Sequence, residues 1–216
     1  MIGEQSRHYF FGASDTRMVL RENHETKTWK QWWAVKLGIV EPEFQGNIYT
    51  NAGNKYEHPI MEALGLKEHE MDLTLYVPKY RLRVNYDGIK LTNDGLITEI
   101  KTFRGDKEFP YDESVKNGYW QQCQVEMYCY LNAVQNDMLP PMLPTMAVDS
   151  RGKPYMIIVG YPLDAEEYFS DKAPEVDVNR LEVHTVYYDK KWIKSVYLPK
   201  LKKLARQLKR GIGDEE

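Results

Sequence analysis

Apolar and polar residues alternate most regularly in the middle of the chain. Across 81–87 every second residue is apolar, which is the pattern of a strand with one buried face. A strong turn signal follows at 92–95, and residues 96–103 are predicted as the returning strand. An apolar segment at 71–77 precedes this pair. The pattern therefore predicts three neighbouring strands.

Helical spacing precedes these strands and returns after them. The sequence predicts a short helix capped around Ser14, a helix over 29–37 capped by Thr28, a helix over 51–64, and a long helix over 114–134. Gly38 and Gly65 follow two of these segments and are typical helix stops. Apolar residues recur every fourth position within 51–64, so one face of that helix is expected to be buried.

The last third of the chain mixes a loop, strands and a basic segment. We predict a proline-rich loop at 138–144, strands at 145–148, 155–161 and 181–188, an acidic surface excursion at about 162–180, and a basic helical segment at about 189–210 with a break at Pro199. This order predicts a mixed central sheet flanked by helices, of the α/β (α+β) class. The length suits a single domain over 1–216.

Composition limits the function classes. The chain has 216 residues, 42% hydrophobic residues and a net charge of −3, which fits a folded globular protein and predicts no global attraction to nucleic acid. A local basic groove stays possible. No apolar run approaches the ~20 residues that span a bilayer, so no membrane contact is expected. Cys123 and Cys129 lie too far apart on a helix for a disulfide, which favours reduced thiols and a cytoplasmic location.

The candidate chemistry lies on the two central strands. Within Glu99-Ile100-Lys101, alternation puts Glu99 and Lys101 on one face and Ile100 on the other. Asp87 on the preceding strand and Glu57 on a helix can add carboxylates to that face. Carboxylates beside a lysine can bind a hard divalent cation next to a positive charge and cut a phosphodiester. The alternative for these residues is a solvated hairpin with an ion pair.

The register of the hairpin decides whether Asp87 reaches that face. A two-residue loop at 94–95 would pair position 87 with 102 and put Asp87 on the wrong face. A three-residue loop at 93–95, with Gly95 in the left-handed conformation, pairs 92 with 96. Asp87 then lies opposite Lys101 and diagonal to Glu99. We predict the three-residue loop.

Other candidates carry weaker signals by themselves. Glu62 is a rival to Glu57 on the same predicted helix. Ser14 and Arg7 are by default a helix cap and a surface charge, but together they can bind a phosphate. Gln124 and Tyr128 share a helix face, which can be solvated or contact DNA.

Tryptophan and lysine clusters also have ordinary explanations. Trp29, Trp32 and Trp33 are expected in the core rather than as a base-stacking platform. Between 190 and 210 the chain has nine Lys or Arg and no acid. We favour a solvated amphipathic face for this segment over phosphate contacts.

Five motifs occur together in one order along the chain: Arg7 with Ser14, Gly53-Asn54-Lys55-Tyr56-Glu57, Asp87-Gly88-Ile89, Glu99-Ile100-Lys101 and Gln122-Cys123-Gln124. In this order they resemble the lambda-type phage exonuclease (YqaJ-like viral recombinase) family of PD-(D/E)XK nucleases. The resemblance extends from about residue 7 to the last helix.

The resemblance implies a role for each catalytic candidate. Asp87 and Glu99, with the carbonyl of Ile100, would ligate Mg²⁺, for which Mn²⁺ is a possible substitute. Glu57 would hold a second metal ion or its water. Lys101 would orient the attacking water and stabilise developing charge.

It also implies the residues that contact DNA. Arg7 and Ser14 would match the 5′-phosphate pocket, Gln124 would match the helix glutamine that faces the active site, and its spacing to Tyr128 matches a Gln-xxx-Tyr motif. Gln122 belongs to the same motif and is a DNA-binding candidate. Asn85 stands where the family has a serine of the phosphate pocket. The sequence departs further by having Tyr86 in place of a proline and a hairpin about two residues longer.

The implied function is a Mg²⁺-dependent 5′→3′ exonuclease. It would digest linear double-stranded DNA from its ends and leave 3′ single strands for phage recombination. The family also implies a homotrimer ring, a single-strand annealing protein as partner, and the host cytoplasm as location. Two alternatives stay open: an endonuclease with the same fold, and a non-catalytic protein that binds DNA ends.

Overall fold

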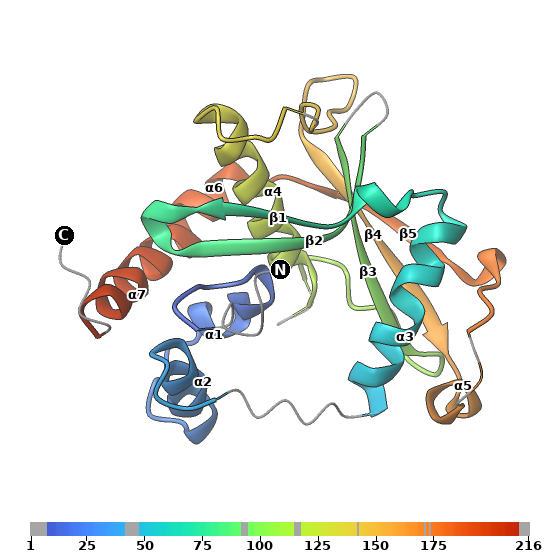
Figure 1. Ribbon diagram of the computed structural model, residues 1–216, viewed down its shortest axis with the longest axis horizontal. Helices are drawn as coiled ribbons and strands as arrows, with labels where there is room; N and C mark the ends of the chain where they lie inside the picture. Colours follow the sequence, from blue (N-terminus) through green and yellow to red (C-terminus); the bar gives the residue numbers. More distant parts are fainter. Residues whose placement is uncertain are drawn as a thin grey trace.

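A mixed five-stranded sheet forms the centre of the protein (Figure 1). The computed structural model describes residues 8–41, 48–91, 95–114, 118–141, 143–170, 172 and 174–211. The strands are β1 (Met71–Val77), β2 (Leu82–Lys90), β3 (Leu96–Arg104), β4 (Tyr155–Leu163) and β5 (Glu182–Tyr187), in the spatial order β1-β2-β3-β4-β5. Strands β3 and β4 are parallel, and the other neighbours are antiparallel. The predicted mixed sheet is confirmed.

Helices flank this sheet. They are α1 (Thr16–Leu20), α2 (Lys27–Lys36), α3 (Ile48–Ala63), α4 (Trp120–Gln135), α5 (Ala165–Phe169), α6 (Lys190–Trp192) and α7 (Leu198–Gly211). Figure 1 shows α3 beside β3, and α7 beyond the far end of the β1–β2 hairpin.

The apolar residues form two clusters. The larger one joins α1, α2, α4 and α7 to the hairpin through residues such as Val84 and Met127, both fully buried. The second joins α3 to β3 and β4 through Tyr56, Ile60 and Ile100. Burial of Ile100 against α3 leaves its neighbours Glu99 and Lys101 free to face elsewhere, as the alternation predicts. Of the three tryptophans of α2, Trp29 belongs to the larger cluster and stacks on Trp33, and Trp32 and Trp33 pack against that cluster, so their core assignment is confirmed.

The first helices begin earlier than the sequence predicts. Thr26, and not Thr28, caps α2, because its side-chain oxygen accepts a hydrogen bond from the N–H of Trp29 at 3.3 Å. Ser14 lies inside a 3₁₀ turn at Ala13–Asp15 that begins after Gly12, so its predicted capping role is wrong. The predicted stops after α2 and α3 are confirmed, since Gly38 and Gly65 have φ of +69° and +78°.

Later elements also differ from the prediction. Helix α4 begins at Trp120 rather than near residue 114. Residues 145–148 make only isolated bridges, Gly95 with Met146 and Val148 with Pro154, so they are not a strand. Pro199 does not break the C-terminal helix. A π-helical turn at Ile193–Tyr197 precedes it, and this wider turn joins α6 to α7 where proline removes a backbone donor.

The hairpin register differs by two residues from the predicted one. Leu96 pairs with Lys90, and Gly88 pairs with Thr98, whereas the prediction paired position 96 with 92. Gly95 does not have a positive φ, so its assignment as a left-handed bulge is wrong. The reason for glycine there is steric: a Cβ would lie 2.7 Å from Tyr130 Oη and 2.8 Å from the carbonyl oxygen of Thr145. Residues 92–94 of the turn lie outside the described residues.

Two expectations about the chain as a whole can be compared with the structure. Cys123 and Cys129 are buried free thiols, as predicted. Among the described residues, no helix combines the length and apolar character needed to cross a bilayer.

Candidate active site

A cleft of about 520 Å³ opens where β2, β3, α3 and the first turn of α4 meet. Seven residues singled out from the sequence line it: Ser14, Glu57, Asn85, Asp87, Glu99, Lys101 and Gln122. Carboxylates from three separate elements therefore converge on one cavity, with a lysine among them.

The two central acids are nearest neighbours across the hairpin. The β2–β3 pairing ends at Gly88 with Thr98, and this register continued by one residue puts position 87 opposite 99, and not opposite 101 as predicted. The N–H of Ile100 donates a hydrogen bond of 2.7 Å to Asp87 Oδ2. Glu99 is 2% exposed and accepts a hydrogen bond and an ion pair from Lys101 Nζ. The shift of two residues preserves the parity, so all three side chains still share the cleft.

The electrostatics of these residues favour a cation. Burial and the nearby Glu99 carboxylate raise the pKa of Asp87 well above its ordinary value. Burial lowers the pKa of Lys101, but Glu99 and Asp87 more than reverse this and raise it above the usual value for lysine. One ammonium group therefore faces several carboxylates. This excess of acids over cations makes the cleft a candidate site for a divalent ion.

Helix α4 contributes a buried acid, Glu126, that was not predicted from the sequence. Gln122 Nε2 donates to Glu99 Oε1 and, at 2.8 Å, to Glu126 Oε1. Glu126 is fully buried, and its Oε2 has no hydrogen-bond partner among the described residues. Burial and the Glu99 carboxylate raise the pKa of Glu126 well above its ordinary value. The signal was available, because Glu126 lies one helical turn after Gln122.

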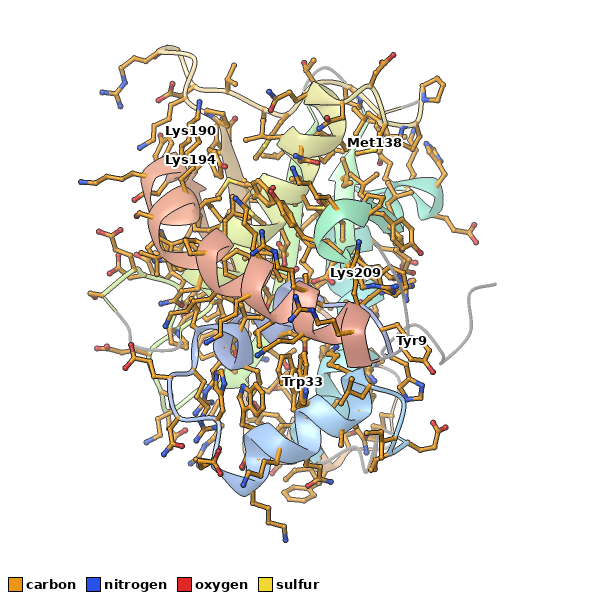
Figure 2. All side chains as sticks on the ribbon, turned by 90° about the vertical axis from the view of Figure 1, so that its left-hand side faces the viewer. Tyr9, Trp33, Met138, Lys190, Lys194 and Lys209 are labelled. Carbon is orange, nitrogen blue, oxygen red and sulfur yellow. The ribbon has the colours of Figure 1, made fainter. Side chains whose placement is uncertain are left out.

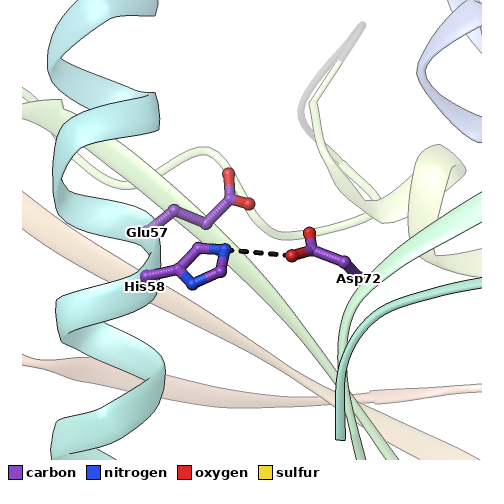
Figure 3. Close-up of side chains that lie close together, drawn as sticks. All are labelled: Glu57, His58 and Asp72. Carbon is purple, nitrogen blue, oxygen red and sulfur yellow. Dashed lines mark ion pairs between the residues drawn. The ribbon is translucent and has the colours of Figure 1, made fainter. Parts of the chain in front are cut away.

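Helix α3 brings Glu57 to the rim of the cleft, next to His58 and Asp72 (Figure 3). The ligand atoms of these three side chains lie within 4.8 Å of one another, and His58 Nε2 is 3.0 Å from Asp72 Oδ2. Burial raises the pKa of Glu57, Lys101 opposes this, and Glu99 and Asp72 add to the increase. Two carboxylates and an imidazole can hold a divalent ion.

Gln124 and Tyr128 do not reach the cleft. Gln124 is fully buried, its Nε2 donates to the carbonyl of Tyr187 at 2.8 Å, and its Oε1 accepts from the N–H of Asp189 at 2.6 Å. Tyr128 lies beside Tyr80 and Tyr188. The prediction that Gln124 faces the active site is therefore wrong, as is that of Tyr128 as its partner there. Two positions along a helix is a rotation of about 200°, so Gln122 points to the cleft and Gln124 away from it.

Two of the three predicted phosphate-binding residues lie in the cleft, and the third is outside the described residues. Ser14 and Asn85 line the cleft, and Thr74 Oγ1 donates to Asn85 Oδ1 at 3.0 Å. Arg7 lies outside the described residues. Arg83 also lines the cleft and was missed, although it shares the strand face of Asn85 and Asp87 at every second position. Its Nε is buried without a hydrogen-bond partner among the described residues. Besides Lys101 and Lys36, which is paired with Asp15, the cleft therefore holds a third cation, Arg83, that can bind an anion.

Comparison with known proteins gives a structural likeness only. No family model matches the chain, and no curated protein matches it. Among solved structures, an alkaline exonuclease (LHK-Exo) from Laribacter hongkongensis has a TM-score of 0.56 at 13% identity, with 96% of this chain and 92% of that chain covered. The complex of LHK-Exo with dAMP has a TM-score of 0.51 at 14% identity, with the same coverage.

A phage-related exonuclease from Haemophilus somnus 129PT has a TM-score of 0.54 at 16% identity, with 93% of this chain and 95% of that chain covered. At such identities the likeness establishes the fold. The chain therefore shares the α+β fold of these exonuclease structures, a mixed five-stranded sheet flanked by helices, which agrees with the fold that the sequence resemblance implied.

Proposed function

We propose that this protein is a metal-dependent deoxyribonuclease that degrades linear duplex DNA from its 5′ ends. The observation that carries the proposal is the convergence of Glu57, Asp87 and Glu99 with Lys101 in one cleft. The fold, shared with exonucleases, is consistent with it.

Asp87 and Glu99, with the Ile100 carbonyl, are the proposed ligands of Mg²⁺ or Mn²⁺. Their fit is supported by the raised pKa values of Asp87 and Glu57, which come first from burial and then from the neighbouring Glu99 carboxylate, against the opposing effect of Lys101. Glu57 is proposed to hold a second ion or its water, which is supported by the nearby ligand atoms of His58 and Asp72. A bound divalent ion supplies the acidity that makes water a nucleophile near neutral pH.

The residues of the chain provide the fixed electrostatics. Lys101 stays protonated, because its pKa lies above the usual lysine value, and its ammonium can stabilise charge that develops on the phosphate. Gln122 Nε2 and Lys101 Nζ both donate to Glu99 Oε1, and Gln122 Nε2 also donates to Glu126 Oε1. The orientation of Glu99 therefore depends on α4 as well as on β3. Gln124 keeps only a structural role.

Ser14, Asn85 and Arg83 are proposed to bind the terminal 5′-phosphate, together with Arg7. Arg83 supports this because it lines the cleft and its buried Nε has no hydrogen-bond partner in the described part of the chain. Arginine and hydroxyl groups are suited to a phosphate dianion. A pocket for a terminal phosphate would select 5′ ends and give the enzyme its direction.

The wider biology follows from the resemblance alone and forms part of the proposal. The nuclease would act as a single domain in a homotrimer ring, supply 3′ single strands to an annealing protein during phage recombination, and work in the host cytoplasm.

A direct test uses end-labelled linear duplex, with and without a 5′-phosphate, in Mg²⁺. We expect nucleotide release that depends on Mg²⁺ and is faster with the 5′-phosphate. Covalently closed circular DNA should stay intact, whereas nicking of the circle would indicate an endonuclease. Binding of ends without any nucleotide release, by protein whose fold is verified, would indicate a non-catalytic end-binding protein and contradict the proposal.

A further inference from the structure

The charges of this protein are strongly segregated along the chain. The segment 190–210 contains nine Lys or Arg and no acid, a charge of +9. The whole chain has 29 basic and 32 acidic residues, so the rest carries 20 basic against 32 acidic residues, a charge of −12. The net charge of −3 therefore hides a basic segment within an acidic protein.

The structure arranges this segment as a continuous strip. Helix α6, the π-helical turn and α7 follow one another without a break from Lys190 to Gly211. Figure 2 shows them crossing one face of the molecule, with Lys190 and Lys194 toward one end and Lys209 toward the other. Twenty residues at ~1.5 Å each make the strip about 30 Å long. We call these nine cations the α6–α7 strip: Lys190, Lys191, Lys194, Lys200, Lys202, Lys203, Arg206, Lys209 and Arg210.

The strip is joined by a cation from another part of the chain. Between β1 and β2, Lys79 and Tyr80 form the tip of the hairpin. With Lys202, Arg206 and Lys209 of α7 they line a hollow of about 300 Å³ that no acid lines. Lys79 Nζ and Lys202 Nζ lie 5.8 and 5.7 Å from the centre of the Tyr80 ring. Tertiary folding therefore concentrates four cations around one concave surface.

These cations are poorly neutralised by the protein itself. In the described part of the chain, Lys200 is the only member of the strip paired with a carboxylate, that of Glu22 at 3.7 Å. The apolar residues of α7, such as Leu201 and Leu208, are buried, so the cations occupy the opposite, exposed face. An amphipathic helix needs polar residues on that face but does not need a single sign of charge.

The hairpin connects the hollow to the cleft. Strand β2 starts at Leu82, next to the hollow, and reaches Asp87 five residues later. At ~3.3 Å per residue this is about 17 Å, or about five base pairs at ~3.4 Å each. One duplex can therefore reach both places.

We propose that the α6–α7 strip, with Lys79, binds the phosphodiester backbone of duplex DNA outside the active-site cleft. This inference rests on the proposed function for its ligand. Duplex DNA is favoured because it carries regularly spaced phosphates over a length that matches the strip. The strip would hold the duplex by charge alone and independently of sequence.

The test replaces Lys202 and Arg206 by glutamine (K202Q/R206Q). The matched control is K27Q/K30Q on the exposed face of α2, which changes the net charge by the same two units. Binding of a fluorescent 20-base-pair duplex is measured in EDTA between 50 and 300 mM NaCl, where no cleavage occurs. We expect K202Q/R206Q to bind roughly tenfold more weakly at low salt, and its slope of log K against log [NaCl] to fall by about 2. The control should match the parent.

Steady-state cleavage in Mg²⁺ provides a second readout. K202Q/R206Q should raise KM and leave kcat unchanged, because the strip does not touch the reacting phosphate. An unchanged affinity and salt slope would overturn the inference. So would a change in oligomeric state by sedimentation with the salt slope unaltered, since the strip would then bind a second copy of the chain.

The two proposals can fail separately. Binding that depends on the strip in EDTA, without any cleavage in Mg²⁺, would retain the strip and reject the nuclease. Normal cleavage by the parent with an identical salt slope in K202Q/R206Q would reject the strip alone.

Discussion

The cleft and the α6–α7 strip place opposite charges in opposite environments. In the cleft, Glu99 and Glu126 are at most 2% exposed, and each carboxylate alters the pKa of its neighbours. In the strip, most of the cations are exposed to solvent. Charges in low dielectric interact strongly, whereas exposed charges are screened by water and salt. The comparison teaches that single substitutions should have large, coupled effects in the cleft and small, additive effects in the strip.

The largest expected effect is the loss of activity when a charged residue of the cleft is replaced. Lys101→Ala and Asp87→Asn should each lower kcat on linear duplex DNA by about 10³-fold, equivalent to about 4 kcal/mol of barrier. Both variants should fold, because neither removes a core side chain. Lys107→Ala, on an exposed turn, is the matched control and should keep parental activity. Parental rates for Lys101→Ala would contradict the proposed mechanism.

The next prediction compares Gln122, on the face of α4 that points to the cleft, with Gln124, on the opposite face. Gln122→Ala should lower kcat by about 10²-fold, since Glu99 loses one of its two hydrogen-bonded partners. Gln124→Ala should lower the free energy of unfolding by about 1–3 kcal/mol, because it removes a fully buried side chain that hydrogen-bonds the carbonyl of Tyr187 and the N–H of Asp189. Urea unfolding and kcat measured on both variants check this. Similar losses of kcat in the two folded variants would contradict the assignment of faces.

A third effect concerns the pH dependence of stability. The pKa of Glu126 is raised in the folded protein, so the folded state keeps a proton that the unfolded state has released. Stability from this group is complete below the unfolded pKa of ~4.5 and is lost as pH rises through the folded pKa. Glu126→Gln should therefore be less destabilised than the parent on going from pH 5 to pH 8. Each unit of pKa shift corresponds to about 1.4 kcal/mol.

Urea unfolding in EDTA at both pH values measures this difference. EDTA is needed because a bound divalent ion would stabilise the ionised carboxylates. A parent and a Glu126→Gln variant with parallel pH dependence would show that Glu126 is ionised in the folded protein.

The smallest effect belongs to the strip. Glu22→Gln removes the carboxylate that faces Lys200, and Glu22 is 92% exposed. The free energy of unfolding should change by less than ~0.5 kcal/mol and become indistinguishable from the parent in 0.5 M NaCl. A larger, salt-independent change would show that the strip is not governed by screened surface charge.

Part of the candidate site could be predicted because it depends on local geometry. The period of two along a strand puts Glu99 and Lys101 on one face and Ile100 on the other, whatever the rest of the chain does. Parity also keeps Asp87 on that face for any register shifted by two. The register itself could not be predicted, because it depends on Gly95 packing against Tyr130 and Thr145, which come from distant segments.

The amino-acid sequence determined the strands, the approximate helices, the mixed sheet and the acid-and-lysine set, since these follow from short-range periodicity and turn chemistry. Only the tertiary structure decided which glutamine of α4 faces the cleft, that Glu126 lies buried behind it, that Arg83 lines it, and that Lys79 meets the cations of α7. Each of these depends on how one element is rotated and packed against another. Burial and long-range charge, which set the pKa values and binding surfaces, exist only after that packing is complete.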